Sequence, residues 1–255
     1  MIKVNTVVRW IAFSIAITYL PFPLLAQALL DKDAPDLDYR MGKIDIRYTI
    51  NADGSFIENR AWEMTVLKES ALEDSKTQRI SYSTSIETSD IIEAYTRKPD
   101  GKRIDVPKDN FQIEANSGRG KDSPIFSDRT YLSIVFPDVS VGDTLVLAYK
   151  LTAKEPMFYN QFSTVETFSR NQAYDNVHIQ IDSPETLWTQ YKATDLKESS
   201  NETKDGRKIV TWQWSNPHPK KSKRQNYSVY NRETEPSLAF STFHNYEEIA
   251  KAYGE

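Results

Sequence analysis

The stretch DRTYLSIVFPDVSVGDTLVLAYKL, residues 128–151, decides the fold class of this chain. It contains two apolar segments separated by a Pro-Asp turn and a Gly-Asp turn. In the second segment Leu145, Leu147, Tyr149 and Leu151 fall on one face, and mostly polar residues alternate with them. An alternation with a period of two predicts a half-buried antiparallel strand. The stretch as a whole therefore predicts a β-hairpin.

The same pattern recurs along the chain and predicts an all-β fold. A hairpin is expected from residues 44–50 and 56–67 around a turn at 51–55. Further strands are expected at 79–87, 91–97, 103–106, 158–168, 177–181, 187–193, 208–214 and 227–230. Short strands at steady spacing predict a large, mostly antiparallel β-sandwich, built as one unit or as two fused halves.

Few other elements are expected. Residues 70–78 predict one short helix, because Ser70 and Glu73 have the spacing of a capping box. Residues 116–127 form the longest loop. In the strand over 56–67, the charged Glu58 and Arg60 fall on the face of the apolar Trp62. Either that end of the hairpin is solvated or a β-bulge shifts the alternation.

The N-terminus predicts a signal peptide over residues 1–28. Lys3 and Arg9 precede an apolar stretch, and Ala26 and Ala28 form a small-x-small cleavage site. The alternative is an uncleaved anchor, but the apolar stretch is shorter than the roughly 20 residues that a membrane span needs. Residues 29–40 predict a flexible acidic linker. We therefore expect a periplasmic or secreted protein of a Gram-negative cell envelope, without a membrane span after cleavage.

Composition excludes several function classes. Two of the 32 basic residues and none of the 36 acidic ones precede residue 29, which leaves the mature part with a net charge of −6. This charge argues against a nucleic-acid partner. The absence of cysteine excludes a lipid-anchored cysteine, disulfides and a thiol nucleophile. No catalytic, cofactor-binding or metal-binding motif is present, so we expect neither an enzyme nor a cofactor.

The strongest candidates for ligand contact are aromatic. Trp212 and Trp214 share a sheet face and could form a platform with Trp188 for a sugar or peptide. The alternative is that they fill the core or an interface with another domain, where aromatic side chains contribute much of the burial. Asp128 and Arg129 could hold a polar ligand, or could form an ion pair at the start of a strand.

Acidic residues leave a hydrolase as a third alternative. Glycoside hydrolysis needs two carboxylates about 5–9.5 Å apart in a cleft. Glu58, Glu63 and Glu166 are considered only because they are acidic residues within strands. The alternation of side chains does not place them together, so a jelly-roll hydrolase ranks below a binding or accessory domain.

The C-terminal residues 236–255 change character. Pro236 and Ser237 suggest a joint, and Asn245 can cap a helix with Glu248 at the reciprocal position. The helix has one apolar stripe, formed by Tyr246, Ile249, Ala250 and Tyr253. We expect the sandwich to occupy residues 41–235 and this helix to be the first of a following domain. The alternative is a terminal helix that docks on the sandwich.

Several short motifs, in this order, resemble a known family over about residues 41–255. They are the Pro-Asp-Gly-Lys turn at 99–102, Ser127-Asp128-Arg129, Phe136-Pro137 with Val141-Gly142-Asp143, the Asp205-Gly206 turn before Trp212, and the ending from Phe243 through Tyr246 to Tyr253. The family is the β-rich domain of unknown function that precedes transglutaminase-like, papain-type cysteine domains in exported bacterial proteins.

The resemblance implies a non-catalytic domain beside an enzyme. Catalysis by cysteine, histidine and aspartate belongs to the following domain in that family, and no such residue can be assigned on this chain. The implied role is a scaffold or substrate-presenting module, with Tyr246, Ile249 and Tyr253 contacting the next domain. The alternative from another class is a free-standing carbohydrate- or peptide-binding protein. The sequence alone does not identify the ligand.

Overall fold

The computed structural model describes residues 35–115, 128–221 and 234–254. The expected signal peptide, the start of the linker, the loop at 116–127 and the strand at 227–230 lie outside the described residues. No helix in the described ranges is long and apolar enough to cross a membrane.

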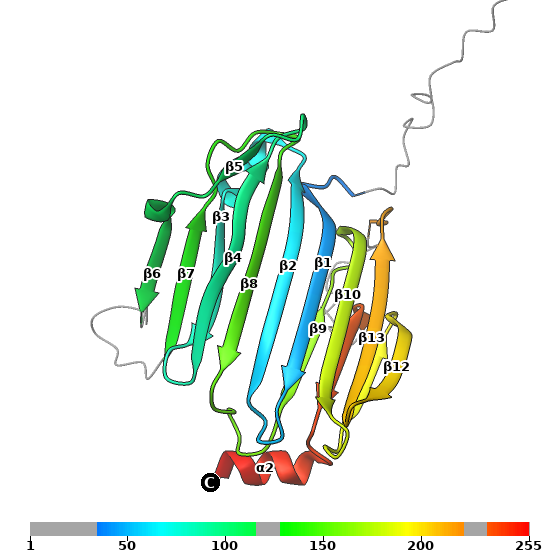
Figure 1. Cartoon of the computed structure of the whole chain (residues 1–255). Helices are drawn as coiled ribbons and strands as arrows, with labels where there is room; N and C mark the ends of the chain where they lie inside the picture. The colour runs from blue at the N-terminus through cyan, green and yellow to red at the C-terminus, as the bar shows by residue number, and fades with distance from the viewer. Residues whose placement is uncertain (1–34, 116–127, 222–233, 255) are drawn as a thin grey trace, which may run out of the picture. The chain divides into compact units, whose positions relative to one another are not determined.

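One large sheet forms the first layer of the molecule (Figure 1). Its strand order is β12-β13-β10-β1-β2-β8-β4-β5. All neighbours in it are antiparallel except β1 and β10, which are parallel. In chain order its strands are β1 (Tyr39–Ile50), β2 (Phe56–Val66), β4 (Glu87–Arg97), β5 (Arg103–Asp105), β8 (Thr144–Ala153), β10 (Ala173–Pro184), β12 (Lys197–Lys204) and β13 (Arg207–Asn216).

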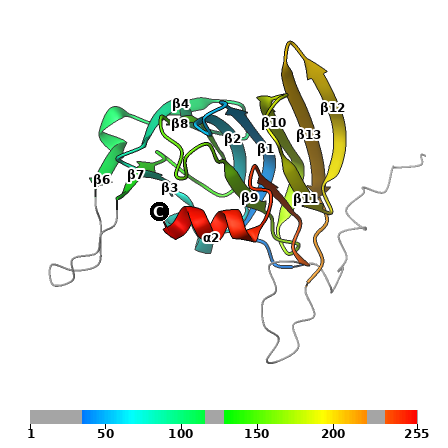
Figure 2. The ribbon, with the colours of Figure 1, turned by 90° about the horizontal axis from the view of Figure 1, so that it is seen from below.

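Two three-stranded sheets form the second layer, and Figure 2 shows the large sheet arching over both. Their strand orders are β3-β7-β6 and β11-β14-β9. Their strands are β3 (Thr77–Ser83), β6 (Phe111–Ala115), β7 (Arg129–Val135), β9 (Ser163–Thr167), β11 (Gln190–Thr194) and β14 (Ser237–Ser241). Because the small sheets cover the same face of the large sheet, that face is the inner face of the sandwich.

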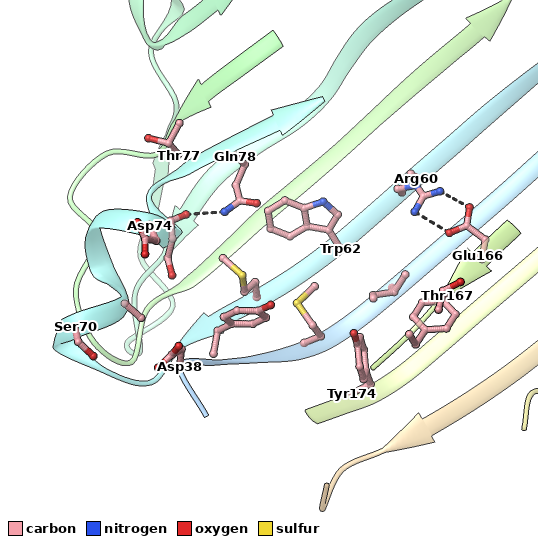
Figure 3. Close-up of a pocket in the computed structure, with 17 residues that line it drawn as sticks. Asp38, Arg60, Trp62, Ser70, Asp74, Thr77, Gln78, Glu166, Thr167 and Tyr174 are labelled. Atoms are coloured by element: carbon pink, nitrogen blue, oxygen red, sulfur yellow. Dashed lines mark hydrogen bonds and ion pairs between the residues drawn. The ribbon is translucent and has the colours of Figure 1, made fainter. Parts of the chain in front are cut away.

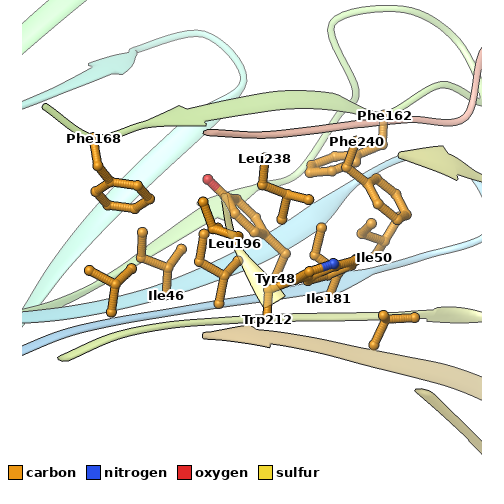
Figure 4. Packing of buried hydrophobic residues seen from close by; sticks show 13 residues of the cluster. Ile46, Tyr48, Ile50, Phe162, Phe168, Ile181, Leu196, Trp212, Leu238 and Phe240 are labelled. Atoms are coloured by element: carbon orange, nitrogen blue, oxygen red, sulfur yellow. The ribbon is translucent and has the colours of Figure 1, made fainter. Parts of the chain in front are cut away.

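Each small sheet encloses its own apolar core. The core under β11-β14-β9 is centred on Trp212, which is fully buried among Ile46, Ile181 and Leu238 (Figure 4). The core under β3-β7-β6 contains Leu145, Leu147 and other residues of β8, β4 and β7. The expected all-β sandwich is confirmed, with one large mixed sheet shared by two smaller ones.

Only a few residues are helical. In the described ranges the 3-10 turns are η2 (Glu69–Ala71) and η3 (Lys108–Asn110), and the α-helices are α1 (Leu72–Ser75) and α2 (Tyr246–Gly254). The predicted capping box at Ser70 is wrong, because neither η2 nor α1 has a side-chain cap. Ser70 lies inside the 3-10 turn, and Glu73 instead pairs with Lys76 at 2.5 Å.

The stretch 128–151 does form two strands, β7 and β8, but the predicted hairpin is wrong. The two strands lie in different sheets, so the chain between them crosses from one layer to the other. Asp143 is 2% exposed at this crossing and accepts hydrogen bonds from Ser140 N–H at 2.7 Å and Lys98 Nζ at 2.9 Å. The Val-Gly-Asp motif therefore has a structural role, with Gly142 at a φ of 90°.

The sandwich extends past the boundary expected at residue 235. Ser237–Ser241 form β14, the central strand of its sheet, where Leu238 and Phe240 are buried. Two further strands, β6 and β12, had not been expected. Strand β12 is polar on both faces and lies at the edge of the large sheet, so it lacks an alternating apolar pattern.

Candidate functional site

The central groove is the space on the inner face between the two small sheets. Edge strands β3 and β9 form its sides, and β2 contributes to its floor. It contains two cavities. The α1 cavity, of about 650 Å³, lies beside α1, and the α2 cavity, of about 730 Å³, lies beside α2. Because residues of β3, β2 and β9 line both cavities, the groove follows both strand edges.

The α1 cavity is apolar at its centre and polar at its sides. In Figure 3 Trp62 of β2 lies between Gln78 of β3 and the Arg60–Glu166 pair. Gln78 is held in place because its amide donates to the Ser75 carbonyl at 2.7 Å. This end of the groove thus presents an aromatic surface to a ligand.

A charged cluster, Glu58, Arg60 and Glu166, lies between the two cavities. Arg60 Nε contacts Glu58 Oε1 at 2.5 Å, and Arg60 Nη2 contacts Glu166 Oε1 at 2.5 Å. Tyr48 donates its hydroxyl hydrogen to Glu166 at 2.6 Å, and Thr164 donates to the Tyr48 oxygen at 3.3 Å. The cluster joins β2 of the large sheet to β9 of the small sheet.

The charged cluster is largely removed from solvent. The Glu58 and Glu166 side chains are each 11% exposed, and Arg60 is 23% exposed. Burial raises the pKa of Tyr48 well above its ordinary value, and Glu166 raises it further. Burial alone would lower the pKa of Arg60, but Glu166 and Glu58 outweigh it and the pKa is raised. Two carboxylates and one guanidinium give the cluster a formal charge of −1.

This arrangement favours binding over acid–base chemistry at these residues. Of the three acids considered from sequence, Glu58 and Glu166 come together, while Glu63 pairs with Arg97 elsewhere. Both carboxylates of the cluster contact the same guanidinium. They therefore do not face each other across an open cleft, as the two acids of a glycoside hydrolase must. The cluster can instead orient a ligand with a positive charge.

The sequence contains one signal for this cluster, and that signal leads to a different expectation. Glu58 and Arg60 fall on the apolar face of β2, and this suggested either a solvated end or a β-bulge. The structure has no β-bulge there, because β2 pairs with β1 and β8 without a register shift at these residues. That end of the strand is also not solvated, because Glu58 is 11% and Arg60 23% exposed. The charges are buried because Glu166, contributed by another strand, completes the ion pairs.

The three tryptophans do not lie on one surface. Trp212 and Trp214 both belong to the inner face of β13, as the alternation predicts. Trp212 is fully buried, and Trp214 stacks on Phe168 with ring centroids 5.7 Å apart. Trp188 is 41% exposed and stacks on His244 at 4.2 Å. The described structure therefore contains no shared platform of these three rings.

Asp128 and Arg129 do not bond to each other in the described residues. Asp128 accepts hydrogen bonds from the Ser83 and Ser85 hydroxyls, and from Ser85 N–H at 3.1 Å. These bonds lower the pKa of Asp128. Arg129 donates to Ser81 Oγ at 2.9 Å. Both side chains thus tie the start of β7 to β3 and to the turn that follows it.

The N-terminus of α2 has a side-chain cap. Asn245 Oδ1 accepts a hydrogen bond from Glu248 N–H at 3.0 Å, as the sequence predicts. The Glu248 carboxylate reaches back one residue further than expected and accepts from His244 N–H at 2.8 Å. The first bond satisfies a backbone donor that a helix otherwise leaves unpaired at its start, and the second holds the residue that precedes the cap.

The apolar stripe of α2 is mostly exposed. Tyr246 is 89% and Tyr253 is 74% exposed, and no residue of α2 is buried. The Tyr253 ring meets Phe158 edge to face, with centroids 4.8 Å apart, and Ile249 lines the α2 cavity. The helix is therefore held through few contacts beside the α2 cavity, and in Figure 1 it lies below the lower ends of the strands.

Comparisons with known proteins give a family and one informative structure. Residues 52–221 match the model of a domain of unknown function with a solved structure, DUF3857. The crystal structure of a "putative protease" from Parabacteroides distasonis ATCC 8503 aligns at a TM-score of 0.71 and 25% identity. The alignment covers 81% of this chain and 41% of that protein, so this chain spans about two fifths of it.

M1 zinc metallopeptidases are among the further structural matches. An M1 zinc metallopeptidase from Deinococcus radiodurans aligns at a TM-score of 0.33 and 10% identity, over 80% of this chain and 42% of that one. A likeness at this level carries no functional argument. A search of curated proteins returns no match to this chain.

Proposed function

The chain belongs to the DUF3857 family of domains of unknown function. Since the family name supplies no role, we propose a function from the geometry of the chain. It is a non-catalytic accessory domain that docks onto a catalytic domain and serves as a scaffold or substrate-presenting module. The observation that carries this proposal is the exposed apolar stripe of α2. We call the docking surface the α2 surface. It consists of Tyr246, Ile249 and Tyr253 with the neighbouring Met157 and Tyr159.

The α2 surface has the properties of an interface. Met157 is 73% and Tyr159 is 86% exposed, and both flank Phe158, which contacts Tyr253. Large apolar side chains that gather at one exposed place mark interaction sites, whereas scattered ones need no explanation. Tyrosine and methionine are also enriched at the centres of interfaces. A second domain would bury these side chains at little cost in polar desolvation.

The partner class rests on the family resemblance. Domains of the resembling family precede papain-type, transglutaminase-like domains, in which a cysteine thiolate attacks an acyl group. This chain has no cysteine, so such a thiolate would have to come from the partner. Most of the Parabacteroides protein lies outside the aligned region, which leaves room there for a further domain.

Export is part of the proposal. The charged start, the apolar stretch and the Ala26-Gln27-Ala28 site support translocation to the periplasm or beyond, with cleavage after Ala28. N-terminal sequencing of the protein recovered from the cell envelope tests this. We expect the mature chain to start at Leu29; a protein retaining Met1 in the membrane fraction would contradict it.

Docking is tested with the papain-type domain encoded after or beside this chain. Its affinity for residues 29–255 is measured by calorimetry, with Tyr246→Ser/Ile249→Ser/Tyr253→Ser as the disrupted variant. Ile92→Ser is the matched control, because Ile92 is 59% exposed on β4, away from α2. We expect the triple variant to lose binding and Ile92→Ser to retain it. Equal binding by all forms, or no binding by any, would overturn the proposal.

A further inference from the structure

The two edges that border the central groove lack a second strand partner in the described structure. β3 pairs only with β7, and β9 pairs only with β14. An edge strand presents alternate backbone N–H and C=O groups that can pair with an added strand. The direction in which those groups point decides whether the groove can accept such a strand.

On β3 the unpaired groups point into the groove. The Lys76 carbonyl accepts from Phe136 N–H at 2.8 Å, and Thr84 N–H donates to the Asp128 carbonyl at 3.0 Å. Since bonding alternates along an antiparallel strand, the even-numbered residues of β3 face β7. The backbone groups of Thr77, Arg79 and Ser81 therefore face the opposite way, toward the groove.

The same alternation holds for β9. Thr242 N–H donates to the Phe162 carbonyl at 2.9 Å, and Phe168 N–H donates to the Pro236 carbonyl at 2.8 Å. The even-numbered residues of β9 thus face β14. The backbone groups of Ser163, Val165 and Thr167 face the groove, and no turn or loop backbone bond uses them.

The interior of the groove is apolar at both ends and negative at its middle. Trp62 lies in the α1 cavity, and Phe56 and Phe162 line the α2 cavity, with the charged cluster between them. The side chains that line the two cavities include six carboxylates but only two guanidiniums and no lysine. Charge complementarity therefore favours a basic ligand.

We propose that the central groove binds an extended basic peptide, which adds as a strand to the free edge of β9. One lysine or arginine lies opposite Glu166 and compensates the formal charge of the cluster. Cross-strand neighbours point to the same face, so the residues two before and two after it face the groove interior as well. These positions take apolar side chains, which gives the pattern apolar-x-basic-x-apolar.

This inference is independent of docking at the α2 surface, because a peptide can occupy the groove whether or not a catalytic domain is bound. If both hold, the accessory domain would hold a peptide substrate close to its enzyme. The variant Tyr159→Ser/Tyr246→Ser separates the two proposals, because both residues belong to the α2 surface and neither lines a cavity of the groove. It should weaken binding of the catalytic domain and keep the peptide.

The probe is the peptide acetyl-Val-Thr-Lys-Thr-Val-amide, titrated into residues 29–255 by NMR. One control peptide has glutamate in place of lysine. The other carries an N-methyl group on one backbone nitrogen, which removes a hydrogen-bond donor. Loss of one backbone bond should weaken binding about tenfold. The glutamate peptide should bind at least about tenfold more weakly than the lysine peptide. Equal binding of the lysine and glutamate peptides, or no binding at millimolar concentration, would overturn the proposal.

The protein variant is Val165→Pro, with Val165→Thr as its matched control. The Val165 side chain is 60% exposed, while its N–H points into the groove, so proline removes one donor without a buried contact. We expect Val165→Pro alone to lose affinity, and the N-methyl peptide gives the same information if this variant does not fold. Unchanged binding by Val165→Pro, or dimerisation of the free protein that Val165→Pro abolishes, would reject a peptide occupant.

Discussion

Two ion pairs on neighbouring strands of the large sheet have the same spacing in sequence but different environments. On β1 Asp45 and Arg47 pair at 2.8 Å; Arg47 is 55% exposed and Asp45 is 16% exposed. On β2 Glu58 and Arg60 pair at 2.5 Å, and Arg60 is 23% exposed. The first pair is on the outer face and the second on the inner face. The first has His178 of the same sheet 3.8 Å from Asp45, whereas the second gains Glu166 from the opposite layer.

The difference shows that an acid-x-arginine pattern in a strand has no fixed energetic meaning. An exposed pair contributes between zero and about 1 kcal/mol, because water screens it and the side chains lose entropy. A buried pair costs desolvation free energy, so its charges must be fully compensated. Arg60 therefore holds two carboxylates in place across the sandwich, whereas Arg47 extends into solvent and pairs with one carboxylate on the outer face.

The largest effect is expected for Arg60→Met. Methionine is apolar and of similar length, so the substitution fills much of the same space but leaves Glu58 and Glu166 buried without a cation. Breaking a buried pair in this way costs about 3–5 kcal/mol of unfolding free energy. Urea denaturation at pH 7 measures it. A triple variant that also carries Glu58→Met and Glu166→Met should recover most of the loss; equal losses in both variants would show that packing, not charge, is disrupted.

A smaller effect is expected at alkaline pH. Burial raises the pKa of Tyr48, so above about pH 10 the unfolded chain loses a phenolic proton that the folded protein keeps. The folded state then binds more protons, and its stability falls by about 1.4 kcal/mol per pH unit for each such tyrosine. Denaturation at pH 9 to 11 measures the slope. Tyr48→Phe should make it shallower; an unchanged slope would contradict the assignment.

The smallest effect is expected for Arg47→Met, the surface counterpart of Arg60→Met. It should change the free energy of unfolding by less than about 1 kcal/mol, and added salt should reduce the difference further. The measurement is urea denaturation at low and high ionic strength. A loss as large as that of Arg60→Met would mean that the two faces of the sheet do not differ as described.

Much of the fold could be predicted from alternation and turn residues. The hairpin of β1 and β2, with its turn at 51–55, and the inner face of β8 follow directly from the pattern. The pairing of β7 was not predictable, because adjacent strands in sequence usually pair and these two lie in different layers. Strand β12 was missed because an edge strand in solvent needs no apolar residues.

Less of the candidate site could be predicted. Charges on the apolar face of β2 indicated something unusual, but their partner Glu166 lies 106 residues from Arg60. The groove itself depends on two edges that belong to separate sheets, β3 and β9. No local pattern encodes the distance or direction between such edges.

The sequence by itself determined the all-β class, which side of most strands faces the interior, and the capped helix α2, because each depends on residues within a few positions of one another. Only the tertiary structure decided that the sandwich has two cores, that Arg60 is a buried cation shared by two layers, and that a groove separates β3 from β9. These features depend on long-range packing, which brings together side chains and strand edges that the chain keeps far apart.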